Sequence, residues 1–281
     1  MNNPTYQEAL NWASSHIVTK KIDTTAPEFI LTQRHNWTTT DLLMNRQAVM
    51  PNSEWLMFQR DIGRLNNFEP AQYIVGHTPF YGNNFTVTPA VLIPESETEE
   101  LVEWVLTEFA AVPALRVLDL GTGSGVIGIT LKLQRPDWQV MASDISTAAL
   151  TVARENAQQL NAEVEFIASD LFTNIKDRFD LIVTNPPYIG TEEIELLDPQ
   201  VLKFEPKMAL FAEQHGMEFY YQLLAQIDRF LRVDGHLFGE IGYQQEDLIK
   251  QAVETRYSTA RIDIKRDISG KPRMFHAWKF V

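Results

Sequence analysis

The tetrapeptide Asn185-Pro186-Pro187-Tyr188 carries the side chains of this chain that are best suited to chemistry. It directly follows the apolar run 179–184, and neither proline can continue a central strand, because proline lacks a backbone N–H and has a fixed φ. A strand therefore ends here, at the edge of an α/β sheet where ligands bind. The Asn185 side chain and a backbone carbonyl can accept the two protons of a planar –NH2 group. Pro187 and Tyr188 offer flat surfaces to its faces. The alternative is an ordinary strand-terminating turn.

A glycine-rich loop upstream favours a binding site over a simple turn. The apolar run 117–120 predicts a strand, and the loop 121–125 follows it and leads into a helical pattern. Glycine lets the backbone turn tightly and approach a ligand closely, and a helix N-terminus presents free N–H groups. Asp119 stands at the strand end, where a carboxylate could meet a ligand ammonium. We therefore expect a cofactor to contact Asp119, Gly121, Thr122, Gly123, Ser124 and Gly125.

A second acidic residue, Asp144, ends the next predicted strand, 138–143. In nucleotide-binding α/β folds a carboxylate at this place accepts hydrogen bonds from ribose hydroxyls. The alternative is that Asp144 serves as the N-cap or turn residue of the helix predicted over 146–159.

The glycine spacing also permits an NAD-dependent oxidoreductase. Gly123-x-Gly125-x-x-Gly128 matches the dinucleotide fingerprint, with an acidic residue about 20 positions further on. Three details argue against this reading. The Asp119 carboxylate would oppose a pyrophosphate, the spacing from the first glycine is one residue tighter, and the tetrapeptide 185–188 has no place in hydride chemistry.

Together these residues resemble the class I S-adenosylmethionine-dependent methyltransferases, in particular the branch that methylates planar exocyclic or amide nitrogens. More specifically, the chain is similar to the peptide chain release factor N5-glutamine methyltransferases over about Glu69 to Val281. The segments that carry this similarity, beside the two motifs above, are 69–76, 80–82, 91–94, 204–206, 209–210, 216–220, 240–244 and 267–270.

The resemblance implies an enzyme that transfers a methyl group from S-adenosylmethionine to a protein. The acceptor would be the side-chain amide nitrogen (N5) of the glutamine in the Gly-Gly-Gln loop of peptide chain release factors, and S-adenosylhomocysteine would be the product. The glutamine would be held by the catalytic residues Asn185, Pro186, Pro187 and Tyr188. The cofactor would be held by Asp119, Gly121, Thr122, Gly123, Ser124, Gly125, Asp144, Asp170, Leu171 and Asn185.

The residue that matches Leu171 flanks the adenine in the family, and Asp170 either reaches the adenine amine or caps a turn. One position also departs from the family, which usually carries Arg-Pro before an acid-Thr-Glu run. This chain has Glu95 and Ser96 there, followed by Glu97-Thr98-Glu99. The resemblance therefore does not extend to any contact that the family's arginine makes to cofactor or substrate, whereas it does extend to the fold and the reaction. Ser96-x-x-Glu99 still predicts a capping box for a helix that runs to about residue 110.

Composition excludes several classes of protein. The 281 residues include no cysteine, which rules out disulfides, zinc–thiolate sites and thiol nucleophiles. The six histidines are scattered without metal-ligand spacing, so we expect no metal site. There is no basic-then-apolar leader, and no apolar run reaches the roughly 18 residues that a membrane helix needs. We expect a soluble, cytoplasmic monomer without membrane contact.

Charge bears on the main alternative function, an N6-adenine methyltransferase that acts on DNA or RNA and shares the tetrapeptide. The net charge of −13 is concentrated in residues 79–281, which carry −12, while residues 1–78 carry −1. Such a domain repels a phosphate backbone, so we do not expect direct nucleic-acid binding. The basic residues of 261–273 are interrupted by acidic ones and indicate a solvated hairpin face. A cofactor-binding protein without catalysis would leave the tetrapeptide unexplained.

The elements that position these residues fall into three predicted parts. Residues 1–78 indicate a small all-α domain that docks the substrate, residues 79–93 a hairpin linker around Gly82-Asn83-Asn84, and residues 94–281 the S-adenosylmethionine-binding catalytic domain. In the last part strands alternate with helices, which predicts a doubly wound, mostly parallel seven-stranded α/β sheet. The predicted strands are 115–120, 138–143, 164–169, 179–184, 236–241, 260–267 and 273–280.

Helices are predicted in the N-terminal domain and between the strands of the catalytic domain. Thr38–Thr40 should cap one of them, and Asn52 or Ser53 another. The final strands, joined by Ser269-Gly270, should form an antiparallel edge. The predicted helices are 6–17, 28–34, 38–46, 52–65, 69–75, 125–134, 146–160, 217–232 and 244–256.

Overall fold

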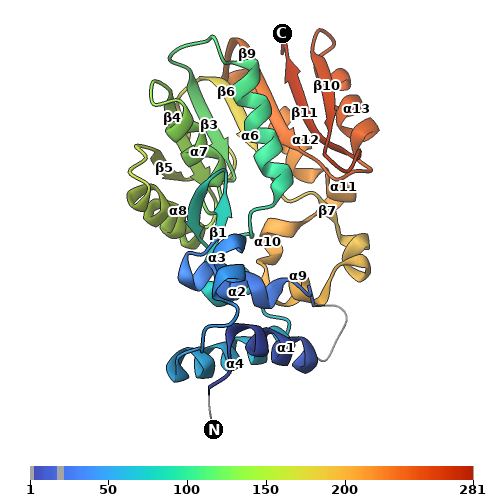
Figure 1. Ribbon diagram of the computed structural model, residues 1–281. Helices are drawn as coiled ribbons and strands as arrows, with labels where there is room; N and C mark the ends of the chain where they lie inside the picture. Colours follow the sequence, from blue (N-terminus) through green and yellow to red (C-terminus); the bar gives the residue numbers. More distant parts are fainter. Residues whose placement is uncertain (1–2, 18–21, 281) are drawn as a thin grey trace. The chain divides into compact units, whose positions relative to one another are not determined.

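The computed structural model describes residues 3–17 and 22–280. The chain forms two compact units (Figure 1). The first comprises the chain up to His77 together with Leu197–Phe204, and the second comprises Thr78–Leu196 and the chain from Glu205 onwards. The segment 79–93 thus falls with the second unit. Among the described residues, no helix is long and apolar enough to cross a membrane.

The first unit is a bundle of short helices, which confirms the predicted helical N-terminal region. Buried apolar side chains such as Leu10, Ile30, Leu42 and Phe58 form its core. Its helices are α1 (Tyr6–His16), α2 (Ala26–His35), α3 (Thr39–Asn45), α4 (Asn52–Asn66), α5 (Ala71–Val75) and α9 (Pro199–Phe204).

Local signals explain where these helices begin. Thr38 caps α3 as predicted, because its hydroxyl accepts a hydrogen bond from the N–H of Asp41 and the Asp41 carboxylate reaches back. The expectation that Asn52 or Ser53 caps α4 was wrong. That helix follows Pro51, whose carbonyl accepts the first helical bond from Trp55, and no side chain caps it.

The second unit is built on a seven-stranded sheet, as predicted. Its order is β10-β11-β9-β6-β3-β4-β5; the five strands from β9 to β5 are parallel, and β11 runs antiparallel to β9 and β10. The strands are β3 (Arg116–Leu120), β4 (Gln139–Asp144), β5 (Glu165–Ala168), β6 (Phe179–Thr184), β9 (Leu231–Glu240), β10 (Arg261–Arg266) and β11 (Pro272–Trp278).

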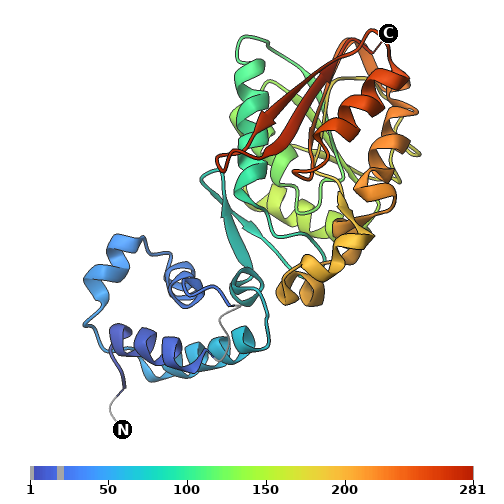
Figure 2. The ribbon, with the colours of Figure 1, turned by 90° about the vertical axis from the view of Figure 1, so that its right-hand side faces the viewer.

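Helices cover both faces of this sheet (Figure 2). Because successive residues of a strand point to opposite faces, Val117 of β3 packs with one layer of helices and Leu118 packs with the other. Apolar residues of α6 (Ser96–Glu108), α7 (Val126–Gln134) and α8 (Thr147–Gln159) form the first core. Those of α12 (Glu218–Leu224) and α13 (Glu246–Arg256) form the second.

The parallel register brings the strand ends to one edge. Leu120 pairs with Ser143, Asp144 with Ala168, and Thr184 with Gly239. The chain leaves β3 toward β4 and β5, and returns on the other side of β3 as β6. The gap between β3 and β6 is therefore the topological switch point, where open α/β sheets bind ligands.

Two local expectations were wrong. Ser96 caps nothing: its hydroxyl bonds the neighbouring Glu97, and Glu99 accepts from the backbone N–H of Tyr81 instead. The helix expected over 217–232 ends at Leu224, and β9 begins earlier than expected, with Leu231 paired to Phe179 of β6. The shorter elements of the chain are β1 (His77–Phe80), β2 (Asn83–Thr86), β7 (Ile189–Gly190), η1 (Thr191–Leu196), α10 (Lys207–Leu210), β8 (Phe211–Ala212), α11 (Glu213–Gly216) and η2 (Ile227–Arg229).

The hairpin of β1 and β2 turns one residue earlier than expected. Tyr81 and Gly82 form its two-residue turn with φ of 46° and 76°, which is the backbone of tight hairpins. Asn156 of α8 then holds β2: its side chain accepts from the Thr86 N–H and donates to the carbonyls of Thr86 and Ser124. One buried amide thus connects the hairpin to the glycine-rich loop.

Candidate active site at the carboxyl edge of the sheet

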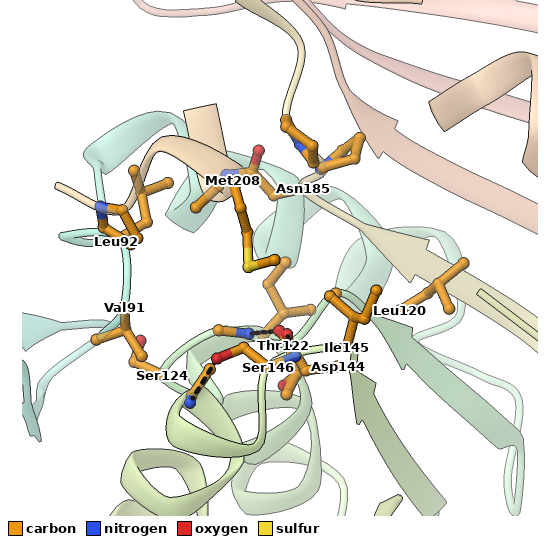
Figure 3. Close-up of a pocket in the computed structure, with 18 of the residues that line it drawn as sticks. Val91, Leu92, Leu120, Thr122, Ser124, Asp144, Ile145, Ser146, Asn185 and Met208 are labelled. Carbon is orange, nitrogen blue, oxygen red and sulfur yellow. Dashed lines mark hydrogen bonds between the residues drawn. The ribbon is translucent and has the colours of Figure 1, made fainter. Parts of the chain in front are cut away.

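A cavity of about 340 Å³ lies at the carboxyl edge of the sheet in the second unit (Figure 3). Its volume is within the range of small-molecule sites. Ten of the thirteen predicted site residues line it: Gly121, Thr122, Gly123, Ser124, Asp144, Asp170, Leu171, Asn185, Pro186 and Pro187. Asp119, Gly125 and Tyr188 are not among the lining residues.

The glycines of the loop have two different roles. Gly121 and Gly123 have positive φ, and a Cβ at either would meet no atom within 4 Å, so bare backbone faces open space there. Gly125 also has positive φ, but a Cβ on it would lie 2.6 Å from the Ile129 side chain and 3.2 Å from that of Ala153. Gly121 and Gly123 thus form the cavity wall, while Gly125 lets the loop pack on α7 and α8.

Asp119 is a structural anchor of this loop. It is fully buried, and its Oδ2 accepts hydrogen bonds from the Thr122 hydroxyl at 2.5 Å and the Gly128 N–H at 2.8 Å. Burial raises the pKa of Asp119 to about 6. Its other oxygen is buried and has no hydrogen-bond partner among the described residues. These contacts tie the loop to the first turn of α7.

The Asp144 carboxylate holds the loop from the neighbouring strand. Its oxygens accept from the N–H of Gly123 at 2.9 Å and of Ser146 at 2.8 Å. The N-cap of α8 is Ser146, whose hydroxyl accepts from Ala149. Asp144 is therefore a turn residue, and it also lines the cavity, where its carboxylate can accept further hydrogen bonds. Burial raises the pKa of this carboxyl above its usual value.

The loop after β5 forms another wall and contains a strained residue. Leu171 has a φ of 45°, a region that L-residues rarely adopt. The Ser169 hydroxyl fixes this turn, because it donates to the Leu171 carbonyl at 2.8 Å and accepts from the N–H of Asn174. Asp170 is exposed beside it, and no described residue donates a hydrogen bond to its carboxylate. The N–H of Thr173 bonds the Asp170 backbone carbonyl, so the side chain does not cap this turn.

Asn185 lies on the opposite side of the cavity from Asp144 and Ser146 (Figure 3). Its Nδ2 donates to the Thr98 hydroxyl oxygen at 3.0 Å, and its Oδ1 is buried without a hydrogen-bond partner among the described residues. A buried acceptor without a partner is rare and costly. An unpaired oxygen at a cavity wall is suited to an N–H of a bound molecule.

A network of side chains continues behind Asn185. The Thr98 hydroxyl donates to Oε2 of Glu240 at 2.7 Å, and the Tyr188 hydroxyl donates to Oε1 at 2.9 Å. Glu240 is 1% exposed, and burial raises its pKa to about 7. Tyr188 thus lies behind the cavity wall, with its hydroxyl bonded to Glu240.

The main chain of the tetrapeptide is also held. The Gln245 side chain donates to the Tyr188 carbonyl at 2.7 Å and to the His215 carbonyl at 2.8 Å. Gly216 has a φ of 77°, and a Cβ there would lie 1.9 Å from the Tyr188 carbonyl oxygen. Only glycine fits this close approach of two backbone segments.

Relatives of this chain are known over nearly its full length. Residues 8–76 match the family described as PrmC N-terminal domain, and residues 98–198 match the family described as Methyltransferase small domain. The release factor glutamine methyltransferase of Enterococcus faecalis is 41% identical, over 96% of this chain and 97% of that protein. The one from Lactococcus lactis is 40% identical, over 88% and 91%. The chain belongs to the release factor glutamine methyltransferase family.

Solved structures confirm the methyltransferase fold. The hMettl16 catalytic domain, solved in complex with the MAT2A 3'UTR hairpin 6, has a TM-score of 0.58 and 15% identity, and the match covers 90% of this chain and 92% of that one. At this identity the likeness concerns the fold alone. Membership of the release factor glutamine methyltransferase family decides against the oxidoreductase reading of the glycine spacing.

Two site residues of this family member carried no predicted role. Thr98 and Glu240 occur in segments that show the family resemblance, yet the bond from Asn185 to Thr98 joins residues 87 positions apart, and the bond from Thr98 to Glu240 joins residues 142 positions apart. A signal for Glu240 was present, because it ends an apolar strand and strand ends meet at one edge of a parallel sheet. No comparable signal in the sequence indicated a role for Thr98.

No group of three or more potential metal ligands occurs in residues 3–17 and 22–280.

Proposed function

We propose that this chain methylates the N5 amide nitrogen of the glutamine in the Gly-Gly-Gln loop of peptide chain release factors. The methyl donor is S-adenosylmethionine and the product is S-adenosylhomocysteine. The observation that carries the proposal is the unpaired, buried Oδ1 of Asn185 at the cavity wall. The names of the curated relatives support the substrate.

The cavity wall opposite Asn185 fits the cofactor. Asp144 offers carboxylate lone pairs for ribose hydroxyls, and the bare backbone of Gly121 and Gly123 allows close approach. Leu171 supplies an apolar surface for the adenine, and the exposed Asp170 carboxylate is available to its amine. The cofactor supplies an activated sulfonium methyl group, so the protein has to bind, align and exclude water.

The tetrapeptide activates the acceptor nitrogen. A carboxamide nitrogen is a poor nucleophile because its lone pair is delocalised into the carbonyl. Oδ1 of Asn185 and the carbonyl of Pro186 accept its two protons, which stabilises the positive charge that develops on nitrogen during transfer. Holding the amide in line for attack contributes further, since proximity and orientation can supply roughly 7–11 kcal/mol of barrier reduction.

The charge distribution favours this protein substrate over the adenine of DNA or RNA. Residues 79–281 carry a net charge of −12, which opposes a phosphate backbone. The decisive assay incubates the full chain with labelled S-adenosylmethionine and either release factor or DNA and RNA. We expect mass spectrometry to find one added methyl group on the Gly-Gly-Gln glutamine. Label on nucleic acid with an unmodified release factor would establish the alternative.

The helical N-terminal domain, residues 1–78, docks the release factor and so delivers its loop. A cytoplasmic location follows from that substrate. On α3, Leu43 is 52% exposed and Met44 is 80% exposed. Both can therefore be replaced without changing the buried core of the helical bundle. Leu43→Ser/Met44→Ser should raise KM for release factor while kcat and cofactor affinity stay the same. Val233→Ser, at a position 85% exposed in the second unit, is the matched control.

A further inference from the structure

We propose that Thr98 and Glu240 are positioning residues that fix which end of the Asn185 amide faces the substrate. This rests on the proposed function. The two ends of an amide side chain have nearly the same shape and opposite hydrogen-bonding character. Only the oxygen can accept a proton of the substrate –NH2 group, so the reversed amide would present a donor to a donor.

The direction of the hydrogen bonds settles the orientation. An ionised carboxylate only accepts hydrogen bonds. The Thr98 hydroxyl has a single proton, and it gives that proton to Oε2 of Glu240 at 2.7 Å. Its oxygen then has only lone pairs for Asn185, 3.0 Å away, which therefore must turn its –NH2 group toward Thr98. Oδ1 points to the other side, where it has no partner among the described residues.

Hydrogen bonds fix both the side chain and the backbone of Glu240. Its Oε1 accepts from the Tyr188 hydroxyl at 2.9 Å, and its backbone carbonyl accepts from the Tyr220 hydroxyl. Because Glu240 is only 1% exposed, bulk solvent does not compete for either of its carboxylate oxygens. The order Glu240–Thr98–Asn185 thus joins β9, α6 and the end of β6, and each member sets the role of the next.

The first test replaces the Thr98 hydroxyl by a methyl group of the same shape. Thr98→Val leaves the Asn185 Nδ2 without its acceptor, so kcat for release factor should fall by about 5-fold to 150-fold, the range for one buried donor left unpaired. KM and the cofactor affinity measured by calorimetry should stay within about 2-fold. Thr98→Ser keeps the hydroxyl and should restore kcat. The matched control is Thr130→Val, the same change at a buried threonine of α7 outside the cavity.

A double-mutant cycle separates orientation from damage to packing. In Asn185→Asp both ends of the side chain are acceptors, so nothing remains to be oriented. Thr98→Val should then lower kcat by less than about 3-fold relative to Asn185→Asp alone. Loss of a donor to Glu240 occurs in both backgrounds and cancels. An equal fall in both backgrounds, or a fall from Thr98→Val that Thr98→Ser does not restore, would overturn the proposal.

A readout without substrate keeps the two hypotheses distinct. In side-chain ¹H–¹⁵N spectra, the –NH2 signals of Asn185 are those missing from Asn185→Asp. They should shift in Thr98→Val by more than in Thr98→Ser or Thr130→Val. If they do, and the wild-type protein still leaves release factor unmethylated, the proposed function fails and the orientation inference stands. If they do not shift, the orientation inference fails whatever the activity.

Discussion

The two ends of the cavity are built in different ways. At the cofactor end, the loop 121–125, Asp144 and the loop 169–171 are held by bonds between side chains and backbone over short sequence distances. The longest of these, from the Asn156 side chain to the Ser124 carbonyl, spans 32 residues. At the amide end, the side chain of Thr98 holds Asn185 across 87 residues and that of Glu240 holds Tyr188 across 52. Thr98 and Glu240 in turn bond each other across 142 residues.

This difference matches what each end has to recognise. A backbone cradle binds a ligand by its shape and needs glycine where the chain comes close. A buried relay of side chains sets the direction of one hydrogen bond, and its members must all be satisfied. We therefore expect substitutions at the cofactor end to change affinity, and substitutions at the amide end to change turnover.

The largest effect should come from the amide end. Asn185→Ala removes the acceptor Oδ1 while the loop, Asp144 and Leu171 remain. Turnover of release factor should fall by about 10²–10³-fold, the loss found for one preorganised polar group. Cofactor affinity, measured by calorimetry, should stay nearly unchanged. Methylation at close to the wild-type rate would refute the role of Asn185, and a parallel fall in cofactor affinity would remove the distinction between the two ends.

A smaller effect on a different quantity is expected at the cofactor end. Asp144→Ala removes two proposed ribose hydrogen bonds, each worth about 1.5–3 kcal/mol with a charged acceptor. It also frees the N–H groups of Gly123 and Ser146. Cofactor affinity should fall at least tenfold, while kcat at saturating cofactor should change little. Asp247→Ala, at an exposed position of α13, is the control. Tighter binding of NADH than of S-adenosylhomocysteine by the wild type would contradict the assignment.

The same contrast explains what the sequence could predict. The strands of the sheet, the glycine-rich loop, Asp144 and the tetrapeptide follow from strand periodicity, glycine and proline, which act within a few residues. Thr98 and Glu240 acquire their roles only when folding brings α6 and β9 beside Asn185. The position of Tyr188 behind the wall, and the wrong capping box at Ser96, have the same cause: tertiary partners, Glu240 and Tyr81, took side chains that local rules assign elsewhere.

The amide end should also respond to pH. Burial raises the pKa of Glu240 to about 7; the hydroxyls of Thr98 and Tyr188 and the charge of Arg273 oppose this shift, and the charge of Glu95 adds to it. Because the relay needs the ionised carboxylate, kcat should rise about tenfold between pH 6 and pH 8. The effect on folding has the opposite sign. A carboxyl whose pKa is raised on folding stabilises the native state at low pH, and that contribution is lost as pH rises through about 7.

Two variants test which carboxyl group causes this pH dependence of kcat. Glu240→Gln cannot ionise and should be slow and insensitive to pH over this range. Burial also raises the pKa of Glu205 to about 7, so Glu205→Gln tests the competing group. The rise in kcat should persist in Glu205→Gln. If it disappears there and persists in Glu240→Gln, Glu205 is the titrating group and the relay has no part in the pH profile.

The smallest effect contrasts two buried threonines of the second unit. The Thr98 hydroxyl both donates and accepts, whereas that of Thr130 in α7 is buried without a partner among the described residues. An unpaired buried hydroxyl costs about 1 kcal/mol or more relative to an apolar group of the same shape. Thr130→Val should therefore raise the free energy of unfolding by about 1 kcal/mol in urea titrations, with full activity. Thr98→Val, the same chemical change, should lower both the free energy of unfolding and the activity. Destabilisation by Thr130→Val would mean that its hydroxyl has a partner, and the contrast between a paired and an unpaired threonine would then be lost.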